Sequence, residues 1–333
     1  MLTKQNTERS WVEIDLSALE HNLRILKGYM QPHQSFLMIV KADAYGHGAA
    51  EISRIAIAEG AVYLGVANPE EGKLLRIQNC QSPILVLSPS LITEIDAILT
   101  YDLTVSVSEL NFAKALSKEA VKQNKCLKIH VKVDTGMRRS GVKAEDFPTL
   151  FQALTELPNL VIEGVFSHFA AAENNPEFSL EQETSFIELL DKLPVIPKYI
   201  HIDNSNALVN KLGKASNLVR LGILAYGVNT SAHSLALQPV MTFKASLSQV
   251  KTMCKGDSIG YNRSWTALQD GTYGIIPIGY ADGYDFLLSN NGVAKISIHT
   301  QANKEEQHLC KVIGRVSMDM ITIDLSHVPD AKV

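Results

Sequence analysis

The sequence predicts an eight-stranded (β/α)8 barrel of the TIM type, followed by a mostly β C-terminal domain. Three observations support this fold class: eight short apolar runs rich in β-branched residues, amphipathic stretches between them, and a change of pattern near Gln238-Pro239. In chain order, the eight runs cover residues 36–41, 62–67, 83–87, 104–107, 127–133, 162–167, 199–202 and 218–221.

The stretches between these runs have the apolar spacing of helices, for example at residues 49–59, 108–123 and 180–190. A strand followed by a helix, repeated eight times, is typical of a closed parallel barrel. An open, doubly wound sheet would give a similar pattern. The count of eight and the lack of a GxGxxG motif favour the barrel, which we place at residues 11–238.

The pattern after about Pro239 is that of strands and turns. Strand-like runs cover residues 240–254, 273–279, 293–299 and 311–324, and turn residues lie at 255–257, 281–283 and 290–292. Asn291-Gly292 between apolar runs is a strong hairpin signal. We therefore expect residues 239–333, together with residues 1–10, to form a β domain.

Charge and residue spacing argue against several classes of protein. The net charge of −4 disfavours nucleic acid or an anionic membrane as the main partner. Residues 1–10 are polar and no apolar run reaches membrane-spanning length, so we expect a cytoplasmic protein without a membrane partner. The four cysteines form no CxxC pair and the ten histidines show no metal-ligand spacing, which predicts reduced cysteines and no metal.

Lys41 is the most informative single residue, because it ends a strongly apolar run. A lysine there is either solvated at the rim of the sheet or held for amine chemistry such as a Schiff base. Tyr45, Gly46 and Gly48 follow within seven residues. The glycines allow the backbone to approach a ligand closely, and the tyrosine has a flat apolar face with a polar tip. These neighbours favour the chemical role.

Polar residues follow several of the other predicted strands, where barrel enzymes place their chemistry. The seventh strand leads to Asn204-Ser205 and the eighth contains Arg220 just before Gly222. Barrels commonly bind phosphate after these two strands. A lysine and a phosphate site together suggest pyridoxal phosphate. Taken alone, Ser205 could equally be a helix N-cap and Arg220 a salt bridge at the rim.

The motifs together resemble those of the bacterial alanine racemase family, which depends on pyridoxal 5′-phosphate. The similarity runs in the family's order from about residue 11 to 325. It rests on the lysine motif at 40–48 and on the motifs at residues 132–137, 166–170, 204–205, 219–222, 259–261, 276–283 and 314–319.

The resemblance implies a two-base site shared between the subunits of a homodimer that racemises alanine. Lys41 would bind the cofactor covalently and act as one acid/base, and Tyr261 of the partner subunit would be the other. The remaining cofactor-binding residues would be Tyr45, His168, Asn204, Ser205, Arg220, Gly222 and Ile223.

The resemblance also assigns the groups around the substrate. Arg139 would contact the cofactor hydroxyl side and the substrate carboxylate, and the partner would contribute Met318 and Tyr280 at the entrance. His201 would orient the arginine at the pyridine nitrogen. Lys132 matches a lysine that some members carry as a carbamate. Asp319 would support the entrance.

Without the resemblance, these residues have plainer interpretations. Tyr261 would be an ordinary aromatic residue of the β domain, and Asp319 would be a cap. His168 and His201 would be barrel histidines whose hydrogen bonds are made within the protein.

Racemisation suits these residue types. A proton must leave one face of a planar intermediate and return to the other, which requires two opposed acid/base groups. Free lysine and tyrosine titrate at roughly 10, so burial beside cations is expected to lower both. Arg220 disfavours a proton on the pyridine nitrogen, since arginine stays charged. A decarboxylase of the same fold would be expected to place an acidic residue there.

Two features depart from the family pattern. The family normally continues into a segment whose tyrosine reaches the cofactor phosphate, and for a chain ending at Val333 we expect an incomplete β domain, weaker cofactor binding and low turnover. Arg138 also replaces an expected small residue. The leading function is the supply of D-alanine for peptidoglycan. The alternatives are a broad-specificity amino-acid racemase and a non-catalytic protein that binds pyridoxal phosphate.

Overall fold

The computed structural model describes residues 8–299 and 305–328, which divide into two compact units. The first unit is Ile14–Met241, and the second consists of the described residues on either side of it. No helix among the described residues has both the length and the apolarity needed to cross a bilayer. The expected incomplete end of the β domain, at residues 329–333, lies outside the described residues.

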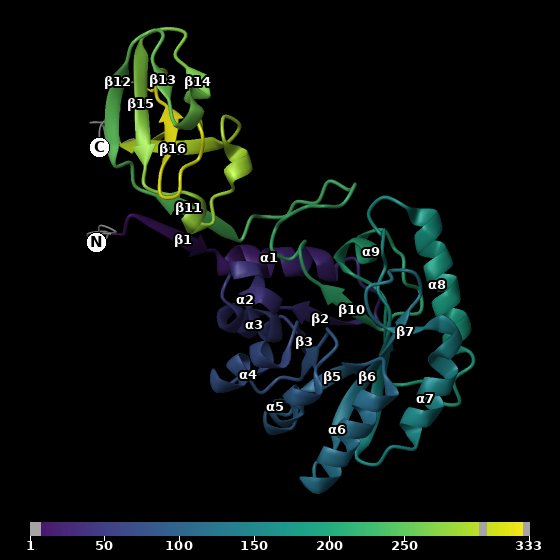
Figure 1. Cartoon of the computed structure of the whole chain (residues 1–333). Coiled ribbons are helices and arrows are strands. Elements are labelled where there is room, and N and C mark those ends of the chain that lie inside the picture. Colours follow the sequence, from purple (N-terminus) through teal and green to yellow (C-terminus); the bar gives the residue numbers. More distant parts are fainter. Residues whose placement is uncertain (1–7, 300–304, 329–333) are drawn as a thin grey trace. The chain divides into compact units, whose positions relative to one another are not determined.

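The first unit is a nearly closed barrel of eight parallel strands, with β7 (Val142–Lys143) paired to the end of β6 (Figure 1). The strand order is β10-β2-β3-β4-β5-β6-β8-β9, which confirms the barrel against the open sheet. Backbone hydrogen bonds bridge the seam between β9 and β10, including Asn217 N–H to Ile200 O at 2.9 Å. The eight strands are β2 (Ser35–Ile39), β3 (Tyr63–Val66), β4 (Ile84–Val86), β5 (Thr104–Val107), β6 (Leu127–Asp134), β8 (Leu160–Phe166), β9 (Tyr199–His201) and β10 (Leu218–Leu221).

Helices cover the outer face of the barrel (Figure 1), and two of them begin at an Asn-Pro pair. Asn68 caps α4 and Pro69 opens it, while Asn175 and Pro176 do the same for α8. The helix α8 therefore begins before the amphipathic stretch at 180–190. The helices are α1 (Leu16–Lys27), α3 (Ala49–Ala58), α4 (Pro69–Ile77), α5 (Ile95–Thr100), α6 (Leu110–Lys122), α7 (Phe147–Thr155), α8 (Pro176–Leu190) and the short α9 (Ser205–Val209).

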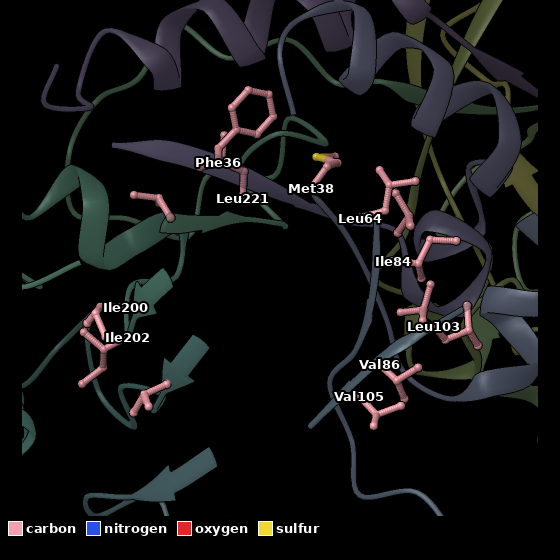
Figure 2. Packing of buried hydrophobic residues seen from close by; sticks show 14 of the residues in the cluster. Phe36, Met38, Leu64, Ile84, Val86, Leu103, Val105, Ile200, Ile202 and Leu221 are labelled. Carbon is pink, nitrogen blue, oxygen red and sulfur yellow. The ribbon is translucent and has the colours of Figure 1, made fainter. Parts of the chain in front are cut away.

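The barrel strands are buried on both faces, which explains their nearly continuous apolar sequences. Alternate residues of β2 divide between two clusters. Phe36 and Met38 join the cluster under the helices, part of which Figure 2 shows, whereas Leu37 and Ile39 join a smaller cluster with Tyr63. Strand alternation therefore builds the helix-facing core and the inner layer from the same short segment.

The second unit contains small sheets, most of them antiparallel, around a core of its own. β12 (Gln249–Met253), β15 (Gly271–Ile276) and β18 (Ile321–Asp324) form a three-stranded sheet. Two-stranded pairs complete the β structure: β1 (Ser10–Ile14) with β11 (Met241–Ala245), β13 (Ser258–Ile259) with β14 (Trp265–Thr266), and β16 (Val293–His299) with β17 (Glu305–Lys311). This β-rich architecture confirms the predicted fold class.

Three details of the predicted β domain are wrong. The run at 240–254 is not one strand, because β11 ends at Ala245 and β12 begins at Gln249 in a different sheet. The run at 311–324 is not one strand, because β17 ends at Lys311 and a loop containing Gly314, at φ 75°, precedes β18. The Asn291-Gly292 pair does not close a hairpin either. Instead, the Asn290 Oδ1 accepts the Gly314 N–H at 2.7 Å, and β16 pairs with the strand that follows it. The hairpin expectation failed because Asn290 is held by hydrogen bonds to Gly314, in the loop that follows β17.

Candidate active site

A cavity of about 430 Å³ lies at the carboxyl ends of the barrel strands. It brings together many of the residues predicted for cofactor and substrate binding, from both halves of the unit. The predicted residues on its wall are Lys41, Tyr45, Lys132, Arg139, His168, Asn204, Ser205, Arg220, Gly222 and Ile223. Four of these are lysines or arginines, so the cavity suits an anionic ligand.

Lys41 follows β2 directly and begins a turn with unusual backbone geometry, Lys41–Gly46 (α2). Ala42, Asp43, Ala44 and Tyr45 all adopt left-handed helical angles, with φ between 50° and 56°. L-residues avoid this conformation at a cost of roughly 1–2 kcal/mol each, so surrounding contacts must hold the turn. The predicted strand over residues 36–41 therefore ends earlier than expected, and the turn places Lys41 and Tyr45 on one cavity wall.

Aromatic side chains support this turn from behind. The Tyr226 ring lies 5.0 Å from that of Tyr45 and 4.6 Å from that of His47, and its hydroxyl donates to Ile39 O at 2.7 Å. His47 Nδ1 lies 2.9 Å from Ala44 O. Since a carbonyl can only accept, Nδ1 must carry the proton.

A small polar cradle lies where β10 and α9 meet. The Gly222 N–H donates to Ser205 Oγ at 2.8 Å. A Cβ at position 222 would stand 3.3 Å from the Tyr45 hydroxyl, so only glycine leaves this space open. Asn204, rather than Ser205, caps α9, because its side chain accepts the Ala207 N–H. The N-cap alternative for Ser205 is therefore wrong, and its hydroxyl is held toward the cavity.

Arg220 is buried and is the centre of a hydrogen-bond network. Nη1 donates to His201 Nδ1 and Nη2 donates to His168 Nδ1, each at 2.8 Å. Further bonds go to the carbonyls of Ser167, His201 and Ile202. None of the ion pairs found among the described residues includes Arg220, so the salt bridge considered for it is absent there.

The charged groups of the cavity shift one another's pKa values. Burial first, and then Arg139, lower the pKa of Lys41, while Glu71 opposes them. Burial, Arg220 and Arg139 lower the pKa of Lys132 to about 8. Burial and the same two arginines hold the pKa of His168 well below its usual value. At neutral pH this histidine is therefore neutral, and Lys41 loses its proton more readily than a free lysine.

Lys132 has a neutral oxygen partner. Its Nζ donates to Ser140 Oγ at 2.6 Å and lies 5.3 Å from the centre of the Phe166 ring. The same ring stacks on His201 at 4.6 Å, so Phe166 separates the lysine from the histidine behind Arg220. Ser140 and Phe166 both line the cavity and were missed as site residues by sequence analysis, although Phe166 opens a quoted motif and Ser140 directly follows Arg139.

The other predicted residues belong to the second unit. Tyr261 begins the short η3 (Tyr261–Arg263) and is largely exposed. The preceding Gly260 packs closely on the backbone of Arg315. Tyr280 begins η4 (Tyr280–Asp282), and its N–H donates to Ser317 O at 3.1 Å, next to Met318 and Asp319. These loops therefore adjoin one another within the unit.

The barrel cavity has the features required to hold pyridoxal phosphate. Tyr45, Ser205 and Gly222 form a cradle that an added Cβ would obstruct. Lys41 lines the same cavity as the cradle, and the buried guanidinium of Arg220 also faces that cavity. A lysine amine, a space with hydroxyl and amide groups for phosphate, and a fixed cation are the donor set that this anionic aldehyde requires.

Comparison with known proteins agrees with this geometry. The family model "Alanine racemase, N-terminal domain" matches residues 14–230, and "Alanine racemase, C-terminal domain" matches residues 240–333. The curated alanine racemase of Halothermothrix orenii is 34% identical over 100% of this chain and 87% of its own length. That of Clostridium novyi is 38% identical over 97% of this chain and 84% of its own.

Solved structures extend the likeness to three dimensions. The alanine racemase of Clostridium difficile 630 superposes with a TM-score of 0.89 and 30% sequence identity. The match covers 99% of this chain and 86% of that one. The chain therefore belongs to the alanine racemase family.

Proposed function

We propose that this protein interconverts L-alanine and D-alanine with pyridoxal phosphate, and that Lys41 and Tyr261 of a partner subunit act as its two bases. The observation that carries the proposal is the barrel cavity, on which Lys41, the cradle at Gly222 and the hydrogen-bonded Arg220 converge. We assign residues 11–238 to the cofactor-binding barrel and residues 239–333 with 1–10 to the domain that completes a neighbouring site.

The cradle residues would hold the phosphate. Tyr45 and Ser205 offer hydroxyls, and the backbone at Gly222 and Ile223 lines the cradle, where the Gly222 N–H orients the Ser205 hydroxyl. Asn204 fixes the start of α9 beside them, and His168 lies next to Arg220 near the predicted ring position. When bound, the cofactor supplies an electron sink for the charge left on the substrate Cα after deprotonation.

Lys41 is suited to take and return the proton on one face. Burial and the nearby Arg139 lower its pKa, so a larger fraction of the amine is neutral near pH 7 than for a free lysine. Arg139 would also attract the substrate carboxylate. The second proton would be exchanged by Tyr261 of a partner subunit, and Tyr280, Met318 and Asp319 of that subunit would shape the entrance.

Arg220 would face the pyridine nitrogen and restrain its protonation. Burial lowers the pKa of Arg220 to about 10, which leaves it cationic at neutral pH. The neutral His201 ring accepts a hydrogen bond from Arg220 and so fixes the position of the guanidinium. A fixed cation disfavours a second positive charge on the ring nitrogen. This limits the electron sink and favours proton return over loss of carboxylate.

The same proposal covers the biological setting. A homodimer places Tyr261 of one subunit at the site of the other, and the product D-alanine would enter peptidoglycan. The four free cysteines suit a reducing compartment such as the cytoplasm. As a carbamate, Lys132 would orient the neighbouring Arg139, whereas its amine donates to Ser140.

The test is conversion of L-alanine to D-alanine by the purified protein with added pyridoxal phosphate in deuterated water. We expect the product to be D-alanine that carries deuterium at Cα. We also expect other amino acids, tested as a panel, to react more slowly than alanine. Comparable rates across the panel would favour the broad-specificity alternative. Cofactor binding without Cα exchange would support a non-catalytic protein. Lys41→Ala should abolish the visible absorbance of lysine-bound cofactor, and Lys125→Ala serves as the control outside the cavity.

A further inference from the structure

We propose that Glu71 is a positioning residue that holds the left-handed turn after β2 and so sets the orientation of Lys41 and the electrostatic field at its amine. The inference deepens the proposed function, on which it rests for the role of Lys41. Glu71 lies on α4, outside the residues that line the cavity, and sequence analysis did not single it out.

The Glu71 carboxylate connects the ends of two neighbouring barrel strands. Oε1 accepts the Ala42 N–H at 3.0 Å, and Oε2 accepts the Ala67 N–H at 2.8 Å. Ala42 directly follows Lys41 and is the first left-handed residue, while Ala67 directly follows β3. Glu71 itself is fixed because its N–H donates to the capping side chain of Asn68. A carboxylate with both oxygens engaged therefore ties the turn to a rigid helix start.

The turn requires such support. Four consecutive L-residues with positive φ are unfavourable, and persist only when the surroundings fix them. Asp43 Oδ1 accepts the Ala49 N–H and His47 holds Ala44 O, but both act on the far side of the turn. Among the side-chain hydrogen bonds of the described residues, the bond from Ala42 to Glu71 is the one nearest to Lys41 along the chain.

Glu71 also opposes the cations around Lys41. The charged and titratable groups of the cavity wall around Lys41 are Arg139 after β6, Lys132 on β6, Arg220 on β10, His168 and Glu173 after β8, and Tyr45 on the turn itself. Arg139 favours loss of the Lys41 proton, whereas Glu71 favours its retention. One carboxylate thus fixes where the amine stands and moderates how far its proton affinity falls.

The test uses Glu71→Gln and Glu71→Asp, with Glu70→Gln as the matched control. Glu70 is the adjacent residue on α4, but its carboxylate is exposed and pairs with Lys73. The Glu71→Gln change keeps the side-chain length and removes the charge, and one of the two polar atoms of the new amide cannot accept an N–H. The Glu71→Asp change keeps the charge, but the shorter side chain lacks the reach to span both backbone amides.

Two readouts on the apoprotein are independent of racemisation. Hydrogen exchange of the peptide spanning residues 40–48 should accelerate about tenfold in both Glu71 variants and remain unchanged in Glu70→Gln. Competitive acetylation of Lys41 across pH should give a lower pKa in Glu71→Gln, because an attractive charge is removed, and a smaller shift in Glu71→Asp.

Exchange at residues 40–48 that matches the wild type in both variants would overturn the proposal, as would an unchanged Lys41 pKa in Glu71→Gln. An equal acceleration across the whole barrel would also overturn it, because the role would then be general stability. Failure of the proposed function can be distinguished from failure of this inference. In that case the wild-type protein would not racemise alanine, but the apoprotein variants would still show the expected exchange and pKa changes.

Discussion

Arg220 donates a hydrogen bond from Nη1 to Nδ1 of His201 at 2.8 Å, and this bond fixes the protonation of the histidine. Since arginine can only donate, Nδ1 of His201 is an acceptor, and its Nε2 must carry the proton. Nε2 lies 2.8 Å from His130 Nδ1, so the proton points to a second buried histidine. Burial and Arg220 hold the pKa of His201 well below its usual value, consistent with a neutral ring.

Replacing Arg220 by lysine should destabilise the protein although the charge is kept. Lysine has three donors, while Arg220 satisfies three carbonyls and two histidine nitrogens. Each buried acceptor left unpaired costs about 1–3 kcal/mol, so we expect Arg220→Lys to lower the free energy of unfolding by about 3 kcal/mol. Urea denaturation of the apoprotein measures this, with the exposed Arg139→Lys as the control. A loss below about 1 kcal/mol would show that the network is not structural.

Adding one methyl group at Gly222 should weaken cofactor binding without unfolding the barrel. The new Cβ would lie 3.3 Å from the Tyr45 hydroxyl, inside the proposed phosphate cradle. We expect Gly222→Ala to raise the dissociation constant of pyridoxal phosphate about tenfold or more, which equals about 1.4 kcal/mol. A fluorescence titration measures it, and pyridoxal without the phosphate should bind both proteins alike. If the substitution weakened the binding of both ligands equally, the phosphate would bind elsewhere.

The charge of Lys132 predicts a pH-dependent stability. Its pKa in the folded protein is about 8, below that of an unfolded lysine, so the folded state binds this proton more weakly. The resulting decrease in the free energy of unfolding is complete below pH 8 and disappears as the pH rises toward about 10.5. Lys132→Met should therefore stabilise the apoprotein by about 1–3 kcal/mol at pH 7, with a gain that shrinks between pH 8 and 10.5.

Urea denaturation at several pH values tests this prediction. Destabilisation by Lys132→Met at pH 7 would contradict a buried, uncompensated ammonium. It would instead indicate that the side chain carries a carbamate paired with the neighbouring arginines, which an intact-mass measurement under native conditions would detect.

Arg138 occupies a backbone position that favours glycine. Its φ is 53°, and its N–H donates to Asp134 Oδ1 at 3.0 Å. Glycine adopts this conformation without the steric cost that a Cβ brings. We expect Arg138→Gly to be more stable than Arg138→Ala by roughly 0.5–1 kcal/mol in thermal or urea unfolding, since both remove the same side chain. Equal stability would mean that the turn carries no strain.

The sequence predicted the barrel well because its strands are buried on both sides. All eight apolar runs correspond to strands, since a parallel barrel needs apolar residues on the inner and outer faces alike. The polar residues at the strand ends could also be located, because the carboxyl ends of such strands converge. Lys41, Ser205 and Arg220 accordingly line one cavity.

Features that depend on register or on distant backbone contacts could not be predicted. The link from His201 to His130 needs the alignment of β6, β8 and β9, in which Phe166 stands opposite both Lys132 and His201. The left-handed turn has no local signature, since alanine, aspartate and tyrosine favour right-handed angles. The proposed role of Glu71 depends on that turn, so the role could not be predicted from the sequence.

The shared site is tested most directly by mixing two inactive variants, Lys41→Ala and Tyr261→Phe, after dissociation and reassociation of the subunits. If each site combines Lys41 of one subunit with Tyr261 of the other, a mixed dimer has one intact site and one site that lacks both groups. Random equal mixing then restores about a quarter of the wild-type racemisation rate. A mixture as inactive as either variant alone, with mixed dimers verified by native mass spectrometry, would contradict the account.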